Sequence, residues 1–257
     1  MEVLRTEARG HAVELAGGAA AAGAALIVAA GGDGTFNEVM NGLAGSSVPM
    51  AIIPAGTTNV LAKELEIPED VKGAVERIIA GRARRLYVGN MAFPDGVSRK
   101  FFLMAGAGFD AEAVYNVDRK LKSLSGKAGY LAGGLKVLRD WDPTPKRAII
   151  DGLQFEFSSL IVCKGARYGG YPKAAPDASL ENPDLYAVVM HGGKRRDVLR
   201  YTLGILTGRH TAFRDVTYLK CGRVDVLDTA HIQADGDYIG KSPVTIETSR
   251  ETVLFVC

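Results

Sequence analysis

Two glycine-rich loops, each placed directly after a short apolar run, restrict the first third of this chain to an α/β fold. The run Ala24–Ala30 leads into Gly31-Gly32-Asp33-Gly34-Thr35, and Met50–Ile53 leads into Pro54-Ala55-Gly56-Thr57-Thr58-Asn59. Apolar residues at helical spacing follow each loop, from Phe36 and again over 71–79. Continuous apolar strands that alternate with helices are typical of a parallel sheet covered on both faces. The sequence therefore predicts two parallel strands, preceded by a helix over 8–20.

Both loops have the chemistry of a phosphate-binding site. The carboxyl ends of neighbouring parallel strands meet at one edge of a sheet, where ligands bind, so the loops are expected to converge. Glycine lets backbone N–H groups approach anionic oxygens, and a helix N-terminus adds favourable dipole charge. The carboxylate of Asp33 would repel phosphate by itself. Its presence indicates a metal ion or a hydroxyl proton close by.

The pattern changes after Leu86, where we predict a boundary between domains 1–86 and 87–257. Pro94-Asp95-Gly96 is a turn signal between two apolar runs, which indicates a hairpin of Leu86–Phe93 with Val97–Met104. The later part contains further strand-like segments at 147–150, 155–163, 185–190, 217–227, 231–234 and 253–256, and helix-like segments at 130–138 and 198–206. We therefore expect a mostly antiparallel β-rich second domain.

Charge and cysteine content limit which classes of binding partner and which cellular compartment we expect. A formal net charge of +2 gives no reason to expect nucleic-acid binding, although it permits contact with an anionic membrane surface. The three cysteines are far apart and form no CxxC pair, which is typical of reduced thiols in a cytosolic protein. The apolar stretch 16–30 is too short for a membrane span, and no signal peptide is recognisable.

These motifs together resemble the diacylglycerol kinase catalytic-domain family, which includes bacterial lipid kinases and sphingosine-kinase relatives. Besides the two loops, the resemblance rests on Tyr168-Gly169-Gly170, Ala175-Pro176-Asp177-Ala178 and Asp235-Gly236-Asp237. It covers nearly the whole chain. It implies transfer of the ATP γ-phosphate to a lipid hydroxyl, most simply diacylglycerol giving phosphatidic acid. It also implies an N-terminal domain like that of NAD kinases and a C-terminal β-sandwich.

The resemblance also assigns a nucleotide site. Backbone N–H groups of the first loop would hold the ATP phosphates, with Mg²⁺ near Asp33. Thr57 of the second loop and Thr6 near the start of the chain would contact the nucleotide, and Asn37 would lie at its rim. The nucleotide-binding set is thus Thr6, Gly31, Gly32, Asp33, Gly34, Thr35, Phe36, Asn37 and Thr57.

Two acids are candidates for the proton acceptor. Asp237 stands where the bacterial family usually has the glutamate of a DGE turn, so its carboxylate is one methylene shorter. Asp33 is the alternative, because in sphingosine-kinase relatives the acid of the GDG turn lies near the substrate hydroxyl. Geometry decides between such candidates before pKa does. We expect both acids to be essential and leave their division of labour open.

A structural Mg²⁺ is a third implication of the family, which binds it in a loop of the form A-x-L-x-D-G-x-L. The corresponding stretch here is Ala178-Ser179-Leu180-Glu181-Asn182-Pro183-Asp184-Leu185. Asn182 replaces the aspartate and Pro183 replaces the glycine, and a neutral ligand weakens a site for a hard cation. The candidate ligands are Ser179, Asn182 and Asp184.

The family normally opens with a strand and helix that precede the segment at Met1, and this unit is expected to be missing. Three functions follow as hypotheses: a lipid kinase that visits the membrane, an NAD kinase-like enzyme, or a truncated homologue that binds lipid or nucleotide without turnover. The first predicts ATP and Mg²⁺ as cofactors, a lipid alcohol as substrate, and a cytoplasmic protein peripheral to the membrane. The Thr57-Thr58-Asn59 sequence favours it over NAD kinase.

Overall fold

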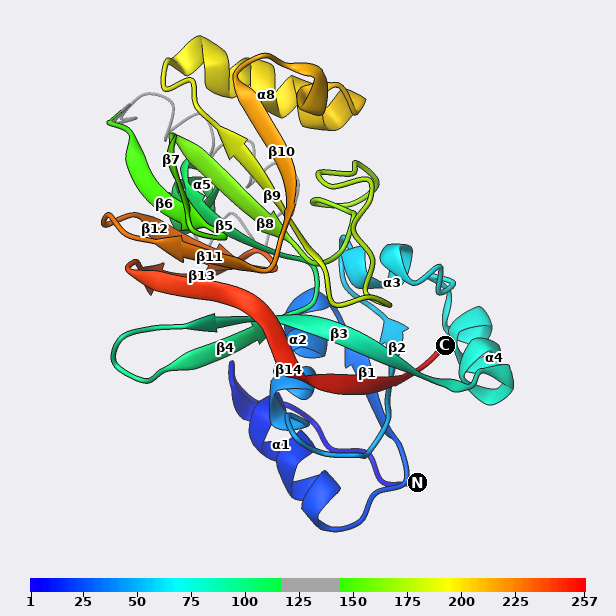
Figure 1. The fold of residues 1–257 in the computed structure, drawn as a ribbon. Coiled ribbons are helices and arrows are strands. Elements are labelled where there is room, and N and C mark those ends of the chain that lie inside the picture. The colour runs from blue at the N-terminus through cyan, green and yellow to red at the C-terminus, as the bar shows by residue number, and fades with distance from the viewer. Residues whose placement is uncertain (117–143) are drawn as a thin grey trace.

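The computed structural model describes residues 1–116 and 144–257, so the helix predicted over 130–138 lies outside the described residues (Figure 1). The first third contains α1 (His11–Ala21), β1 (Ile27–Gly31), α2 (Asp33–Gly42), β2 (Met50–Pro54), α3 (Val60–Glu64) and α4 (Val71–Ala80). The rest contains β3 (Ala83–Ala92), β4 (Ser98–Phe101), β5 (Met104–Gly108), α5 (Phe109–Asn116), β6 (Lys146–Ile150), β7 (Leu153–Phe157), β8 (Ser159–Cys163), β9 (Leu185–Met190), α8 (Arg195–Thr207), the 3₁₀ turn His210–Ala212, β10 (Val216–Cys221), β11 (Arg223–Val226), β12 (His231–Ala234), β13 (Asp237–Lys241) and β14 (Val244–Val256).

The predicted α/β arrangement of the first third is confirmed. β1 and β2 pair in parallel, in register from Ile27 with Met50 to Gly31 with Pro54, so both strands end at one edge. α2 packs on β1 and α4 packs on β2. α4 begins where expected, because the Asp70 side chain accepts a hydrogen bond from the amide of Gly73 at 2.9 Å and so caps the helix.

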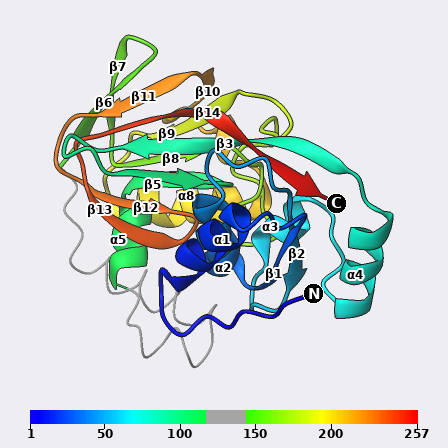
Figure 2. The ribbon, with the colours of Figure 1, turned by 90° about the horizontal axis from the view of Figure 1, so that it is seen from below.

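The last strand joins the two parts of the chain. β14 runs antiparallel to β3 along most of its length and pairs in parallel with β2 through Phe255 and Met50 (Figure 2). The sequence predicted only 253–256 of this strand. The stretch from Thr248 to Thr252 is polar and contains a register shift, so it breaks the apolar pattern while the strand continues. The boundary predicted after Leu86 falls within β3, across which the sheet is continuous.

Three segments that read as single strands turn out to cross between sheets. The described strands form an eight-stranded and a six-stranded sheet. The segment 155–163 bends at Ser158 into β7 and β8, and 217–227 bends at Gly222 into β10 and β11, with one strand of each pair in each sheet. The second arm of the predicted hairpin, 97–104, likewise ends at Phe101 before β5 enters the other sheet. The sequence pattern does not reveal such corners, because only one or two residues separate the two strands of each pair.

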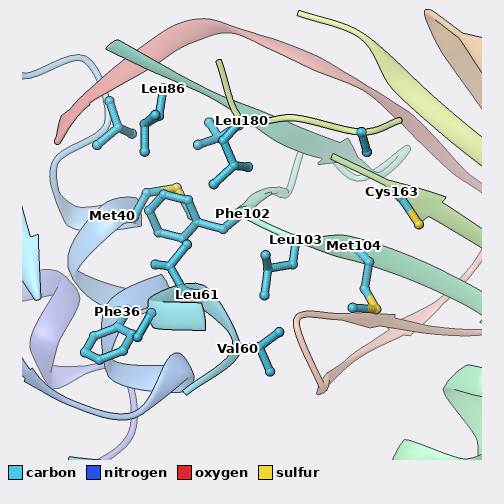
Figure 3. Close-up of a cluster of buried hydrophobic side chains, with 14 of the residues drawn as sticks. Phe36, Met40, Val60, Leu61, Leu86, Phe102, Leu103, Met104, Cys163 and Leu180 are labelled. Carbon is cyan, nitrogen blue, oxygen red and sulfur yellow. The ribbon is translucent and has the colours of Figure 1, made fainter. Parts of the chain in front are cut away.

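The described residues form two apolar cores. One fills the space between the two sheets and includes Phe101, Phe157 and Ile246. The other lies under α2 and α3 and contains Phe36, Met40, Leu61, Leu86, Phe102 and Leu180, which converge from both parts of the chain (Figure 3). The mostly antiparallel second part and its helix over 198–206, now α8, are therefore as predicted.

Candidate active site

The two glycine-rich loops lie against each other at the carboxyl ends of β1 and β2. The amide of Ala55 donates to the carbonyl of Gly31 at 2.7 Å. A Cβ on Gly56 would lie 2.6 Å from Cα of Gly32, so a larger residue there would push the loops apart. The side chain of Asn59 closes the second loop, accepting from the amide of Gly56 and donating to its carbonyl, both at 3.0 Å. The predicted convergence of the loops is confirmed.

Asp33 is the residue that ties these loops together. It opens α2, and its Oδ2 and Oδ1 accept hydrogen bonds from the amides of Val60 and Leu61, each at 3.0 Å. Those amides belong to the first turn of α3 and have no partner within the helix. A carboxylate is also favoured electrostatically at a helix N-terminus. The sequence predicted Asp33 to lie near Mg²⁺ or to accept a proton. In the structure, both of its carboxylate oxygens hold α3 against α2.

A pocket of about 280 Å³ opens beside the first turn of α2. Its walls are Thr6, Ala8, Arg9, Gly34, Thr35, Glu38 and Asp237. A Cβ on Gly34 would meet nothing within 4 Å, so the backbone of this turn is open on that side. The first-turn amides of a helix lack intrahelical partners and carry partial positive charge, which suits an anionic group such as phosphate.

Four of the predicted site residues meet in this pocket: Thr6, Gly34, Thr35 and Asp237. The remaining predicted residues do not line it. Phe36 is fully buried in the apolar core, and Thr57 is exposed on the second loop. Gly31, Gly32 and Asp33 contribute to the contact between the loops instead.

Two charged pocket residues, Arg9 and Glu38, were not singled out from the sequence. Glu38 accepts hydrogen bonds from the amides of Gly10 at 2.9 Å and Ala12 at 3.3 Å, which fixes the start of α1 against α2. Arg9 approaches Asp237, with Nη2 3.3 Å from Oδ1. Arg9 lies three residues after Thr6 and Glu38 three residues after Thr35, so their charge close to predicted nucleotide-binding residues was the available signal.

Asp237 is presented by a tight turn. β12 and β13 are joined by Asp235 and Gly236 alone, since Ala234 pairs with Asp237. Both turn residues have positive φ, 47° and 81°, which is the type I′ conformation that Asp-Gly favours. The turn and the catalytic interpretation of this motif are therefore compatible, because the turn places Asp237 at the pocket wall.

The carboxylate of Asp235 anchors that turn. It accepts hydrogen bonds from the amides of Phe102, Leu103 and Met104 at 2.8, 2.9 and 3.0 Å, where the chain passes from one sheet to the other. Asn37 Nδ2 donates to the same carboxylate at 2.9 Å. Burial raises the pKa of Asp235 to about 6, while these four N–H groups act in the opposite direction. Sequence reasoning missed this role, since it treated Asp235 only as part of the turn.

Asn37 links α2 to the β-rich part. Besides Asp235, its Nδ2 donates to the carbonyl of Lys100 at 3.2 Å, and its Oδ1 accepts from Arg99 Nη2 at 2.7 Å. The residue is 3% exposed. Asn37 was predicted to lie at the rim of the nucleotide site. In the structure it is buried, and its hydrogen bonds align α2 with the Asp235 turn.

A second buried acid, Asp110, is also connected to the turn. It accepts hydrogen bonds from the hydroxyl of Tyr168 and from Gln233 Nε2, the latter at 2.6 Å. Gln233 Oε1 in turn accepts from the amide of Gly236 at 2.9 Å. Burial raises the pKa of Asp110, and the two donors oppose that rise. The tyrosine of the Tyr168-Gly169-Gly170 motif is therefore connected to the Asp-Gly turn through two side chains.

The groups proposed to bind a structural Mg²⁺ are engaged with other residues. Asn182 Oδ1 accepts from the amide of Asp184 at 3.1 Å, and Ser179 Oγ accepts from the amide of Glu181 at 3.1 Å. Asp184 Oδ2 is 2.8 Å from Nζ of Lys220. Among the described residues, no group of three or more His, Cys, Asp and Glu side chains is arranged to hold a metal ion.

A buried lysine reaches into the same loop. Lys164 is 0% exposed, and its Nζ donates to the carbonyls of Ser179 and Asp184. Burial lowers the pKa of Lys164 to about 8, so the ammonium form predominates at neutral pH. Both carbonyls therefore face a positive charge that belongs to the chain itself. These residues do not fit the predicted metal site.

Comparison with known proteins shows which family has this sequence and fold. The family model described as diacylglycerol kinase catalytic domain matches residues 1–91, and the model described as YegS C-terminal NAD kinase beta sandwich-like domain matches residues 104–256. A protein named diacylglycerol kinase from Bacillus subtilis strain 168 is 34% identical over 246 residues, covering 93% of this chain and 79% of the relative. The chain belongs to the diacylglycerol kinase catalytic-domain family. The predicted family resemblance is confirmed.

A further relative and two solved structures are also similar to this chain. A diacylglycerol kinase from Staphylococcus aureus strain Newman is 30% identical over 244 residues, covering 93% of this chain and 76% of the relative. A crystal structure of a diacylglycerol kinase from Bacillus anthracis strain Sterne has a TM-score of 0.71 and 20% identity, covering 99% of this chain and 84% of that one. A second structure from that organism has a TM-score of 0.79 and 23% identity, covering 99% and 83%. These structural matches show a shared fold.

The described helices are all either too short or too polar to cross a membrane.

Proposed function

We propose that this protein transfers the γ-phosphoryl group of ATP to the hydroxyl of a lipid, with diacylglycerol as acceptor and phosphatidic acid as product. The two relatives at 34% and 30% identity that are named diacylglycerol kinases support this choice. The observation that carries it is the pocket in which the open first turn of α2 faces Asp237. Anion-binding amides and a carboxylate on one pocket are what a phosphoryl transfer to an alcohol requires.

The phosphates of ATP would lie at the first turn of α2. Gly34 and Thr35 offer backbone N–H groups there, and Thr35 adds a hydroxyl. Arg9, 61% exposed at its side chain, adds a cation to the pocket beside Asp237. Mg²⁺ bound with ATP would neutralise phosphate charge. Of the two carboxylates in the pocket, we assign the contact with Mg·ATP and substrate to Asp237, because both oxygens of Glu38 accept backbone hydrogen bonds.

Asp237 would accept the proton of the lipid hydroxyl. As the hydroxyl oxygen bonds to the γ-phosphorus, the bond from that phosphorus to the β–γ bridging oxygen breaks, and ADP leaves. The hydroxyl proton passes to the Asp237 carboxylate and then to solvent. Asp33 is the weaker candidate for this step, because both of its oxygens bind the amides of α3.

The lipid acceptor implies contact with a membrane surface, and we propose that the protein is cytoplasmic and peripheral to the membrane. α8 supports this proposal with exposed Leu199, Leu203 and Leu206, and with Arg195 and Arg196 in its first turn. Exposed apolar residues next to basic ones favour anionic bilayers. The three buried cysteines without disulfides are consistent with a reducing compartment. Co-sedimentation with anionic vesicles, but not with zwitterionic ones, tests the membrane contact.

The activity is tested by transfer of labelled phosphate from ATP to diacylglycerol in mixed micelles, with NAD as the competing acceptor. We expect labelled phosphatidic acid, and a rate reduced by about 100-fold or more in Asp237→Asn, as is typical for loss of a general base. The Tm of this variant should match that of the unchanged protein. Labelled NADP instead would favour the NAD kinase-like hypothesis, and binding of Mg·ATP without any transfer would favour the homologue without turnover.

A further inference from the structure

We propose that the ammonium group of Lys164 takes the place of a metal ion in loop 178–185, so that this loop needs no divalent cation. The inference concerns how the loop is held and does not depend on the proposed kinase activity. The first observation is in the sequence: the aspartate and glycine of the family's Mg²⁺ motif are replaced by Asn182 and Pro183.

The position of the Lys164 side chain is the first support. Its Nζ donates to the carbonyls of Ser179 and Asp184, which stand near the two ends of the loop, the second at 3.2 Å. The side chain is fully buried, and a buried ammonium is costly unless it is hydrogen-bonded and compensated. Carbonyl oxygens supply the hydrogen bonds, and the carboxylates of Asp184 and Glu64 supply compensating charge.

The state of the remaining oxygens is the second support. The Asn182 side chain closes a local turn on the amide of Asp184, and the Asp184 carboxylate pairs with Lys220. Mg²⁺ demands near-octahedral oxygen ligands at about 2.0–2.1 Å. An ammonium already bound to two of the available carbonyls would repel a divalent ion at that distance. The loop therefore contains its cation as a side chain.

This arrangement connects the loop to the active site. Two and three residues after Lys164, the amides of Ala166 and Arg167 donate to the carboxylate of Glu64 at 2.8 and 3.1 Å. Glu64 is the last residue of α3, whose first turn is held by Asp33. The lysine thus sets the geometry of a segment that packs on the helix behind the second glycine-rich loop.

Thermal unfolding of the full chain without nucleotide tests the proposal. We expect the same Tm in EDTA as in millimolar MgCl₂. Lys164→Met should lower Tm by roughly 5 °C or more, because two buried carbonyls lose their donor. Lys220→Met is the matched control, since it removes the exposed lysine that pairs with the same Asp184, and its shift should stay below about 2 °C.

Two results would overturn the inference. One is a Mg²⁺-dependent rise in the Tm of the unchanged protein that Asn182→Ala abolishes, which would place a metal in the loop. The other is an equal, small shift for the two lysine variants. A Mg²⁺ effect that survives Asn182→Ala comes from outside the loop and agrees with the proposal. If Lys164→Met does not fold, the EDTA and Mg²⁺ comparison on the unchanged protein still decides.

Discussion

Two carboxylates of this site have structural roles that their residue type does not reveal. Asp33 stands in the most phosphate-like motif of the chain, yet its carboxylate holds the amides of Val60 and Leu61. Asp235 was expected only to form a turn, yet it binds four N–H groups that align the turn with α2 and β5. In both cases a carboxylate satisfies backbone donors that would otherwise be buried without a partner.

We therefore expect Asp33→Asn to act first on stability. An asparagine has only one acceptor oxygen, so its NH₂ group would face one of the two α3 amides. The free energy of unfolding should fall by roughly 1–3 kcal/mol, the usual cost of an unsatisfied buried donor. Chemical denaturation measures this, with Asp95→Asn as the control, because Asp95 makes a similar side chain-to-amide bond on an exposed turn. Equal stability of Asp33→Asn and the unchanged protein would contradict the structural role.

The ion pair of Asp228 with Arg147 makes a pH-dependent contribution to the stability of the folded protein. Arg147 donates to Asp228 from its amide, Nε and Nη2, at 2.7–2.9 Å, and these bonds lower the pKa of Asp228 from 3.8 to about 2. Because the folded pKa is the lower one, the stabilisation is complete above the ordinary value and is lost as pH falls toward 2. The Tm difference between the unchanged protein and Asp228→Asn should therefore be largest near neutral pH and shrink below pH 3.8. A difference independent of pH would argue against this pair.

At the scale of elements, the site depends on how closely two strand-to-helix loops approach. Gly32 and Gly56 lie so near that a Cβ on Gly56 would come within 2.6 Å of the neighbouring backbone.

Several strands were predicted with the wrong length because of how consecutive strands are connected. At Ser158 and Gly222 the chain turns a corner between sheets, and a single residue separates the two strands.

Gly56→Ala should accordingly separate the two loops. The methyl group would also lie 2.8 Å from Oδ1 of Asn59, so the hydrogen bonds that close the second loop would be strained. We expect a rise in the KM for ATP of about tenfold, equivalent to roughly 1.4 kcal/mol. Gly18→Ala is the control, because a Cβ there meets nothing within 4 Å in α1, and alanine favours a helix. An unchanged KM would show that the loop contact is not needed for nucleotide binding.

At the scale of the whole molecule, β14 joins the parallel strands of the first part to the sheet of the second. Its Phe255 is fully buried, pairs with Met50 of β2 and packs edge-on against Phe102, with ring centroids 6.4 Å apart. Phe255 is thus part of the core that lies under α2 and α3. Neither part can lose its structure without exposing apolar surface of the other.

We expect the chain to unfold in one cooperative transition. Phe255→Ala should reduce the free energy of unfolding by roughly 3–5 kcal/mol, as for other buried aromatic residues, and should shift the whole transition. Leu254→Ala, the adjacent half-buried residue of the same strand, is expected to cost less. Differential scanning calorimetry distinguishes the cases. Two separate transitions, with only one moved by Phe255→Ala, would show that the parts fold independently.

The sequence by itself determined the glycine-rich loops, the parallel strands before them, the β-rich remainder and the place of Asp237 beside a tight turn. These follow from local periodicity and turn chemistry, which act over a few residues. Only the tertiary structure decided the partners of Asp33, Asp235 and Lys164, because each binds backbone groups far away in the chain. A residue type states which hydrogen bonds a side chain is able to form. Packing alone brings the partner within reach.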